Sequence, residues 1–213
     1  MPTLYIIAGS NGAGKSSAGP DLLPTALIDK HAPFDGDKLK SVKQLEFRNQ
    51  LRCSYKEAGK LADEFVDKTF ETQYKSALAQ NEDFVYEGHF TEEESWTLIG
   101  LFKKAGYQVN MLFMGLATLE VSQDRVFKRA MNGGHNVPIY EIEKNYYGNL
   151  YKLNQHFDLI DELIILDSSE ELVLHLATKK GNTLVFHISP TEIPQWFSKG
   201  LPDLFKQGTF TEM

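Results

Sequence analysis

Short apolar runs alternate with longer amphipathic stretches along the chain, and this alternation predicts an α/β fold. Apolar runs at residues 3–8, 84–86, 107–114 and 162–166 have the length and residue types of buried strands. Polar stretches with apolar residues at helical spacing separate them. Because strands and helices alternate with short connections, we expect a P-loop-kinase-like, mostly parallel sheet with helices on both faces.

Capping residues bound several of the predicted helices. Thr118 is a favourable N-cap for a helix over residues 119–132, which the glycine pair at 133–134 ends. Another helix begins after Pro138 and runs to about residue 156. Further helices are predicted over residues 38–51, 55–80 and 91–105. The 55–80 helix carries an apolar stripe that is expected to face the core: Leu61, Phe65, Val66, Phe70, Tyr74, Ala77 and Leu78.

The C-terminal part of the chain predicts a different arrangement. Runs at residues 172–178 and 183–188 flank a turn and indicate a hairpin that adds an antiparallel edge to the sheet. The proline-containing segment that follows is expected to be a surface tail held by Trp196 and Phe197. With no repeat and no linker, residues 1–213 are interpreted as one domain, with a helical lid at about 119–157 and a hairpin and tail at about 172–213.

Composition narrows the functional classes. The apolar fraction of 42% and the charged fraction of 24% are ordinary for a globular protein. A net charge of −7 and a pI near 5.4 argue against a protein that binds nucleic acid by bulk electrostatics. The single cysteine, Cys53, cannot form an intramolecular disulfide, and the first apolar run is too short for a signal peptide or membrane span. A cytoplasmic protein with no membrane contact is therefore expected.

A phosphate-binding loop follows the first predicted strand. The pattern G-x-x-x-x-G-K-S lies between a strand and a helix start, which is the context that a P-loop requires. Backbone N–H groups of such a loop cradle nucleotide phosphates, the lysine bridges the β and γ phosphates, and the serine hydroxyl ligates Mg²⁺. The expected residues for ATP are Gly9, Ser10, Asn11, Gly12, Ala13, Gly14, Lys15, Ser16 and Ser17, with Ser16 also the metal ligand. The alternative is a Gly-rich turn with an exposed Lys15.

The helix after this loop is expected to be short or kinked. Gly19 and Pro20 fall where its second turn would run, and proline removes a hydrogen-bond donor there.

Two acidic positions near predicted strand ends are candidates for chemistry. Asp37 follows the presumed second strand, where a carboxylate could take a proton from an acceptor hydroxyl. Asp35 competes for this role, and Asp37 could instead be a solvated loop residue or a helix N-cap. Glu87 could hold a substrate hydroxyl or a Mg²⁺-bound water, or be an ordinary strand-end residue. His89 is interpreted as a polar loop residue without a role.

Basic residues on the 119–132 helix are candidates for stabilising transferred phosphate. Arg125 and Arg129 share one helix face, although a solvated basic face would have the same spacing. The loop at 133–138 has the glycines of a lid hinge, and His135 within it is either a substrate-binding or a structural residue. Three tyrosines in the next helix are interpreted as packing first and as a substrate wall second: Tyr146, Tyr147 and Tyr151.

Several of these motifs together resemble the zeta toxin family of P-loop kinases, in particular a shorter stand-alone branch of zeta-toxin-like ATPases. The resemblance rests on residues 5–16, on Phe34-Asp35-Gly36-Asp37 and on Arg125-Val126-Phe127-Lys128-Arg129. It is strongest in Gly133-Gly134-His135-Asn136-Val137-Pro138, followed by Ile142 and by Leu166-Asp167-Ser168-Ser169. It spans residues 3 to about 170.

The resemblance implies an ATP- and Mg²⁺-dependent kinase that phosphorylates a hydroxyl of a small acceptor. The characterised toxins of the family phosphorylate UDP-N-acetylglucosamine, with a base that matches Asp37 and a glutamate that matches Glu87. It also implies a small antitoxin protein as a partner and, by analogy, adenine near Ser168 and Ser169.

The sequence departs from the family pattern at several acceptor-side positions. Arginines that are usual in this branch are replaced by Lys144, Asn145 and Gly148, and Lys cannot reproduce bidentate phosphate contacts. Either Arg125, Arg129 and Lys144 suffice, or the activity or substrate differs. The alternatives to a UDP-sugar kinase are a nucleotide-binding module or slow ATPase read by a protein partner, and a kinase of another metabolite.

Overall fold

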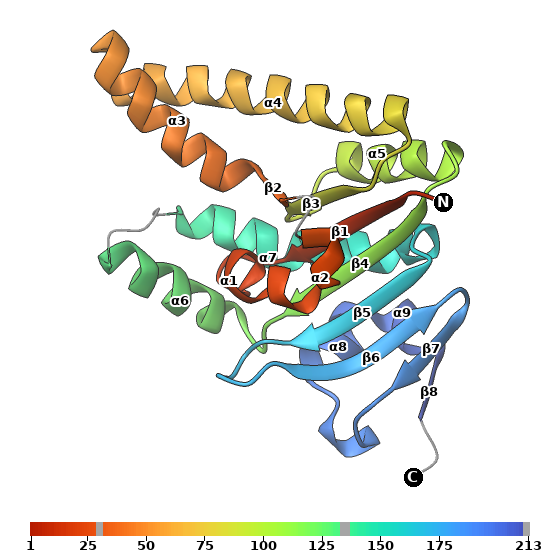
Figure 1. Cartoon of the computed structure of the whole chain (residues 1–213). Coiled ribbons are helices and arrows are strands. Elements are labelled where there is room, and N and C mark those ends of the chain that lie inside the picture. The colour runs from red at the N-terminus through yellow and green to blue at the C-terminus, as the bar shows by residue number, and fades with distance from the viewer. Residues whose placement is uncertain (29–31, 133–136, 211–213) are drawn as a thin grey trace.

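The computed structural model of the chain describes residues 1–28, 32–132 and 137–210 (Figure 1). Within these residues one sheet has the strand order β2-β3-β1-β4-β5-β6-β7-β8. The strands are β1 Thr3–Gly9, β2 Phe34–Asp35, β3 Phe84–Gly88, β4 Gln108–Gly115, β5 Glu162–Asp167, β6 Leu174–Lys180, β7 Thr183–Phe186 and β8 Gly208–Phe210. The sheet is parallel from β2 to β5, and β6 is antiparallel to both of its neighbours. The predicted α/β class is confirmed.

Strand β1 lies at the centre of the parallel part, between β3 and β4. Its residues Leu4, Ile6, Ile7 and Ala8 are at most 1% exposed, as expected for an apolar run covered on both faces. Because β1, β2 and β3 run in the same direction, their carboxyl ends meet at one edge of the sheet. Ligands of open α/β sheets bind at this edge.

Helices cover the sheet on both faces, with α1 and α2 in front of it and α7, α8 and α9 behind it in Figure 1. Their bounds are α1 Lys15–Ala18, α2 Thr25–Ile28, α3 Gly36–Leu51, α4 Tyr55–Gln80, α5 Glu93–Lys104, α6 Leu119–Met131, α7 Ile139–His156, α8 Gln195–Gly200 and α9 Pro202–Phe205. The predicted cap is confirmed, since Val121 N donates to Thr118 Oγ1 at 3.3 Å. The first helix is short, as predicted: α1 ends at Ala18, and Pro20 opens a 3-10 turn over Pro20–Leu22.

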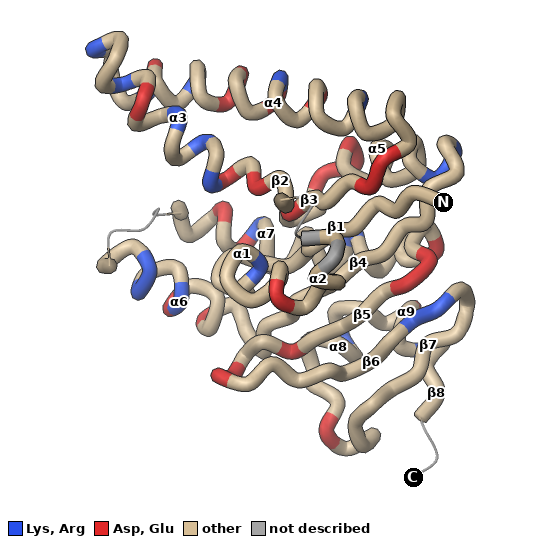
Figure 2. The backbone as a smooth tube through the Cα atoms, viewed as in Figure 1, with Lys and Arg blue, Asp and Glu red and all other residues tan. Residues whose placement is uncertain are grey.

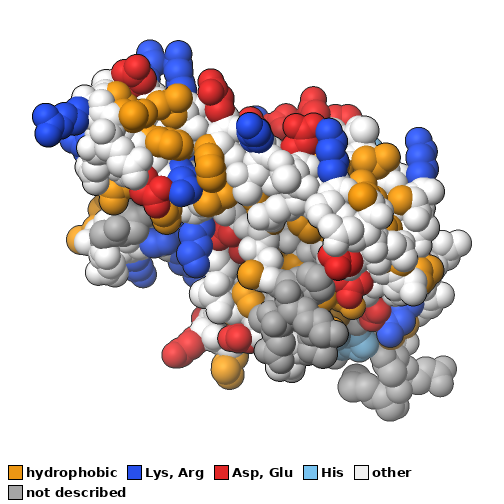
Figure 3. Space-filling model, turned by 45° about the horizontal axis from the view of Figure 1, so that its top comes forward, with side chains coloured by type: hydrophobic (Ala, Val, Ile, Leu, Met, Phe, Trp, Pro, Cys, Tyr) orange, Lys and Arg blue, Asp and Glu red, His pale blue; other side chains and the backbone are white. Residues whose placement is uncertain are grey.

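Helices α3 and α4 form a pair that extends beyond the sheet (Figure 1). The C-terminal part of α4 packs on the core through Val66, Phe70, Tyr74 and Leu78, which confirms the predicted stripe there. At Phe65 the prediction is wrong, because this ring is 38% exposed and meets the Phe47 ring of α3 edge-on. The outer end of the pair therefore carries exposed apolar side chains (Figure 3).

The C-terminal segment is more ordered than the sequence predicted. The hairpin of β6 and β7 is confirmed, but the supposed tail folds into α8, α9 and β8. Strand β8 pairs parallel with β7, so the edge of the sheet is not the antiparallel hairpin. The prolines do not break structure, because Pro194 and Pro202 stand at helix starts, where proline is tolerated. Trp196 and Phe197 are 5% and 0% exposed and anchor the segment, as expected.

None of the helices in the described ranges combines the length and the apolar character needed to cross a bilayer.

Candidate functional site

The predicted phosphate-binding loop connects β1 to α1 at the carboxyl edge of the sheet. Gly12 and Gly14 have φ angles of 74° and 89°, a region that glycine adopts without strain. A Cβ on Gly12 would also come within 2.9 Å of the Arg125 Cβ. Both glycines are therefore required by the backbone path, and the loop presents its backbone toward the space where phosphates would lie.

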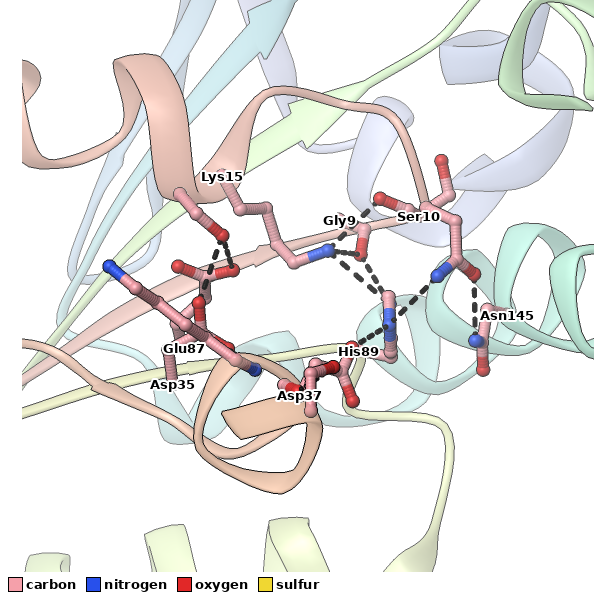
Figure 4. A network of polar contacts seen from close by, with 12 residues as sticks. Gly9, Ser10, Lys15, Asp35, Asp37, Glu87, His89 and Asn145 are labelled. Carbon is pink, nitrogen blue, oxygen red and sulfur yellow. Dashed lines mark hydrogen bonds and ion pairs between the residues drawn. The ribbon is translucent and has the colours of Figure 1, made fainter. Parts of the chain in front are cut away.

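Lys15 is buried beneath this loop rather than exposed. Its Nζ donates to the carbonyl oxygens of Gly9 and Ser10, each at 3.0 Å, and the residue is only 8% exposed (Figure 4). Burial lowers the pKa of Lys15, and the nearby carboxylates of Glu87, Asp37 and Asp35 oppose that shift. The alternative of a turn with an exposed lysine is wrong.

Three side-chain oxygens gather beside the lysine. The Ser16 hydroxyl lies 2.6 Å from Glu87 Oε1 and 3.1 Å from Asp35 Oδ2 (Figure 4). Burial raises the pKa of the Glu87 carboxyl, and the Asp35 charge raises it further, while the Ser16 hydrogen bond works against both. Glu87 is thus buried, at 8% exposure, and lines the same cavity as Ser16 and Asp35.

This oxygen cluster fits Mg²⁺. Mg²⁺ takes oxygen ligands and is commonly held by one or two carboxylates together with substrate phosphates and water. No group of three or more His, Cys, Asp and Glu side chains in the described residues could hold a metal alone. A metal would therefore rest on Ser16 with Asp35 or Glu87 near it, and on phosphate oxygens of a bound nucleotide.

The structure separates the two competing aspartates. Asp35 is the N-cap of α3, accepting from Lys38 N at 2.9 Å, and faces Ser16. Asp37 lies in the first turn of α3, with its side chain 73% exposed and its Oδ2 3.4 Å from His89 Nε2. The suggestion that Asp37 caps the helix is wrong. Asp35 belongs to the oxygen cluster and Asp37 faces the open side.

His89 is a site residue that the sequence analysis missed. Its ring is partly buried between the loop and α3, with Nδ1 2.9 Å from the Gly9 carbonyl oxygen and 3.4 Å from Lys15 Nζ (Figure 4). Burial lowers the pKa of His89, and the Lys15 charge acts in the same direction. Its position could have indicated a site residue, because His89 directly follows β3 and is two residues after Glu87.

Helix α6 brings its arginines to the opposite wall. Arg125 donates to Ser169 O at 2.7 Å and to Gly12 O at 3.2 Å, so it joins the phosphate-binding loop to the segment after β5. Arg129 borders the same cavity. Figure 2 shows basic residues along α6 and acidic residues where β2, β3 and α3 meet. A purely solvated helix face is therefore wrong for Arg125.

The side chains converge on one cavity of about 570 Å³, a size typical of small-molecule sites. It is lined by Asn11, Gly12, Ala13, Gly14, Lys15, Ser16, Ser17, Asp35, Asp37, Lys38, Ser41, Val42, Glu87, His89, Arg125 and Arg129. Gly9 and Ser10 supply the carbonyls that hold Lys15.

The three α7 residues that stand where the family usually has arginine have different surroundings. Lys144 is not among the cavity's lining residues; it pairs with Glu92, which raises the pKa of Lys144. Asn145 donates to Asn11 Oδ1 at 2.8 Å and so contacts the phosphate-binding loop. At Gly148 a Cβ would lie 3.0 Å from the Thr91 side chain, so the helix approaches its neighbour too closely for an unadjusted arginine. His135 lies outside the described residues.

The expected adenine-side residues are structural partners of the loop. Ser168 is buried and donates to Ala13 O at 2.8 Å, and Asp167 accepts from Ser169 N and from Trp196 Nε1.

The tyrosines of α7 only partly pack as predicted. Tyr146 is buried and donates to Leu116 O at 3.0 Å, and burial raises the pKa of Tyr146 to about 12. For Tyr147 and Tyr151 the packing prediction is wrong, because they are 56% and 61% exposed.

Solved structures with the same fold include a chain from a toxin-antitoxin system. A chain in a crystal structure of AvrRxo1-ORF1:-ORF2 with ATP aligns at a TM-score of 0.68 and 15% identity, covering 98% of this chain and 77% of that one. A chain from the PezAT chromosomal toxin-antitoxin system of Streptococcus pneumoniae aligns at 0.61 and 17%, covering 97% and 86%. No curated protein matches the sequence. At these identities the alignments establish the fold.

The sequence itself establishes the family. Residues 1–180 match the family described as Zeta toxin, which leaves only the β7 to β8 region unmatched. The predicted resemblance is confirmed, and the chain belongs to the zeta toxin family.

Proposed function

We propose that this zeta toxin family protein is an ATP- and Mg²⁺-dependent phosphotransferase that transfers the γ-phosphate to a hydroxyl of a small acceptor. The observation that carries the proposal is the Ser16, Asp35 and Glu87 oxygen cluster beside Lys15, with Asp37 on the same cavity. Family membership supports a kinase of the P-loop type. The AvrRxo1-ORF1:-ORF2 structure, which was solved with ATP, agrees with ATP as the donor.

The residues divide into a donor side and an acceptor side. The backbone of residues 9–17 binds the nucleotide phosphates, and Lys15, Arg125 and Arg129 stabilise the charge of the transferring phosphoryl group. Ser16 would hold Mg²⁺, which when bound would neutralise negative charge on the nucleotide phosphates.

On the acceptor side, Asp37 is the general base. It accepts the hydroxyl proton as the acceptor oxygen bonds to the γ-phosphorus and the bond to the β-phosphate oxygen breaks. Its exposure on the cavity leaves it accessible to an incoming hydroxyl. Glu87 would hold an acceptor hydroxyl or, with Mg²⁺ present, a water of the metal.

The first acceptor class to test is the UDP-sugars, with UDP-N-acetylglucosamine as its leading member, because that is what the family resemblance implies. Two positions favour an acceptor other than UDP-N-acetylglucosamine. Asn145 donates to Asn11 and Lys144 pairs with Glu92, so neither side chain replaces the phosphate contact of the usual arginine. His135 remains a candidate acceptor contact by its place in the family motif.

A second candidate is a nucleotide-binding module whose state is read by a small antitoxin-like protein. Exposed apolar side chains on α3 favour it, since Val42 borders the cavity and Leu45 lies one turn further at 58% exposure. The aligned PezAT chain comes from a toxin-antitoxin system, which agrees with such a partner.

Mass spectrometry of ATP-Mg²⁺ incubations with UDP-sugars, nucleosides and common sugars tests the proposal. The intact protein should add one phosphate to at least one acceptor, and Lys15→Ala and Asp37→Asn should not. Asp37→Asn should still bind ATP. Tight ATP binding with every tested acceptor unmodified would overturn sugar-nucleotide phosphorylation as the leading proposal and favour the partner-read module.

A further inference from the structure

His89 lies at the junction of the donor and acceptor sides, and the roles above leave it unused. Its ring nitrogens face opposite ways: Nδ1 faces the Gly9 carbonyl and Lys15, and Nε2 faces Asp37 and Asn11 (Figure 4). The side chain is only 17% exposed, so the packing around it fixes the ring. One imidazole therefore spans from the phosphate-binding loop to the candidate base.

The hydrogen-bond partners indicate where the ring proton lies. The shortest contact is Nδ1 to Gly9 O at 2.9 Å, and a carbonyl oxygen can only accept, so Nδ1 carries the proton. A neutral ring then has a lone pair on Nε2. Asn11 Nδ2, at 3.4 Å, can donate to it, and Asp37 Oδ2 lies at the same distance.

Burial and the charge of Lys15 both lower the pKa of His89, so both disfavour the protonated ring. The Asp37 carboxylate is the charged group that acts in the opposite direction. A carboxylate and an imidazole lone pair attract each other only when a proton lies between them. This pair gains such a proton when Asp37 takes one from an acceptor.

We propose that His89 is a positioning residue for the base: once Asp37 has removed the proton from the acceptor hydroxyl, His89 Nε2 shares that proton and holds the Asp37 carboxyl in place. The hydroxyl O–H bond breaks, its oxygen bonds to the γ-phosphorus, and the electron pair of the broken P–O bond leaves on ADP. The proton then rests between Asp37 and His89 Nε2. This inference rests on the proposed phosphotransferase function.

Two substitutions separate the two nitrogens. In His89→Asn the side-chain amide can replace Nδ1 and donate to Gly9 O, but nothing reaches Asp37. In His89→Gln the amide can reach the place of Nε2 and donate to Asp37, without accepting a proton. With the acceptor found for the intact protein, kcat should fall at least tenfold in His89→Asn, while the ATP dissociation constant stays within about twofold. His89→Gln should recover part of kcat.

Two outcomes of this comparison overturn the inference. An unchanged kcat in His89→Asn would mean that the Asp37-facing nitrogen does nothing. Loss of ATP binding in parallel with kcat, in a folded His89→Asn protein, would mean that His89 only supports the loop.

A measurement without turnover keeps this test separate from the proposed function. The His89 pKa can be followed by NMR of the imidazole nitrogens in the intact protein and in Asp37→Asn. Removing the carboxylate should lower the His89 pKa, because Asp37 raises it. Equal pKa values would refute the pairing. A clear shift in a protein that phosphorylates nothing would instead refute the phosphotransferase while leaving the pairing intact.

Discussion

Ser16 and Glu87 are 71 positions apart in the chain, yet the Ser16 hydroxyl oxygen lies 2.6 Å from Glu87 Oε1. This contact is the main local support for a carboxylate that burial and Asp35 otherwise disfavour. Glu87→Gln keeps an acceptor oxygen for Ser16 and removes the buried charge. The substitution should therefore raise the free energy of unfolding of the nucleotide-free protein at pH 7.5.

The pH dependence of that gain has a definite sign. The folded-state pKa of Glu87 is raised, so its ionisation destabilises the fold once the pH exceeds the unfolded-state value of about 4.3. The difference in melting temperature between Glu87→Gln and the intact protein should shrink to zero on acidification to about pH 4. Each kcal/mol corresponds to about 2–4 °C in a domain of this size. A difference that is the same at both pH values would contradict the shift.

Lys15→Ala should remove most nucleotide binding, because the buried ammonium beneath the loop is lost. Calorimetric titration with ATP-Mg²⁺ should show a dissociation constant at least tenfold larger, which is a loss of about 1.4 kcal/mol in binding free energy. Lys144→Ala is the matched control, since that lysine is exposed and paired with Glu92. Equal effects of the two substitutions would argue against a phosphate site at Lys15.

Arg125→Lys should weaken ATP binding although it keeps the charge. One ammonium cannot span Gly12 O and Ser169 O as the guanidinium does. Amide hydrogen exchange should increase in the loop at residues 9–17 and in the segment after β5. Lys128→Ala, on the same helix and exposed, serves as the control and should change neither measurement. Unchanged exchange in Arg125→Lys would show that the bridge does not hold the loop.

Trp196→Phe tests how the C-terminal segment supports the site. An aromatic ring remains, but the hydrogen bond from Nε1 to Asp167 is lost, with an expected cost of about 1 kcal/mol in unfolding free energy. Trp196→Ala should cost more, about 3–5 kcal/mol, because it also opens a cavity against Gly115. Chemical denaturation measures both. Equal losses of unfolding free energy in the two variants would show that packing of the Trp196 ring does not contribute to stability.

Local signals explain why much of the fold was predictable. The apolar run of β1, the Thr118 cap and the break at Pro20 act through neighbours in the sequence, and each was confirmed. The tail was mispredicted because its order comes from distant partners: Trp196 bonds to Asp167, and β8 pairs with β7.

The candidate site was predictable in its loop and less so elsewhere. The glycine and lysine pattern identifies residues 9–17, since backbone geometry demands it. The division between Asp35 and Asp37 depends on which one caps α3, which spacing alone left open. His89 was missed because its contacts with Gly9 and Asp37 arise only when β3, the loop and α3 come together.

The α3–α4 pair has a mechanical consequence. Asp35 ends β2, whereas Asp37 lies in the first turn of α3, at the base of an arm that packs on the core through Leu39 of α3 and the C-terminal part of α4. Asp35 caps α3 and also contacts Ser16, so a displacement of this arm would act on the oxygen cluster and on Asp37 together.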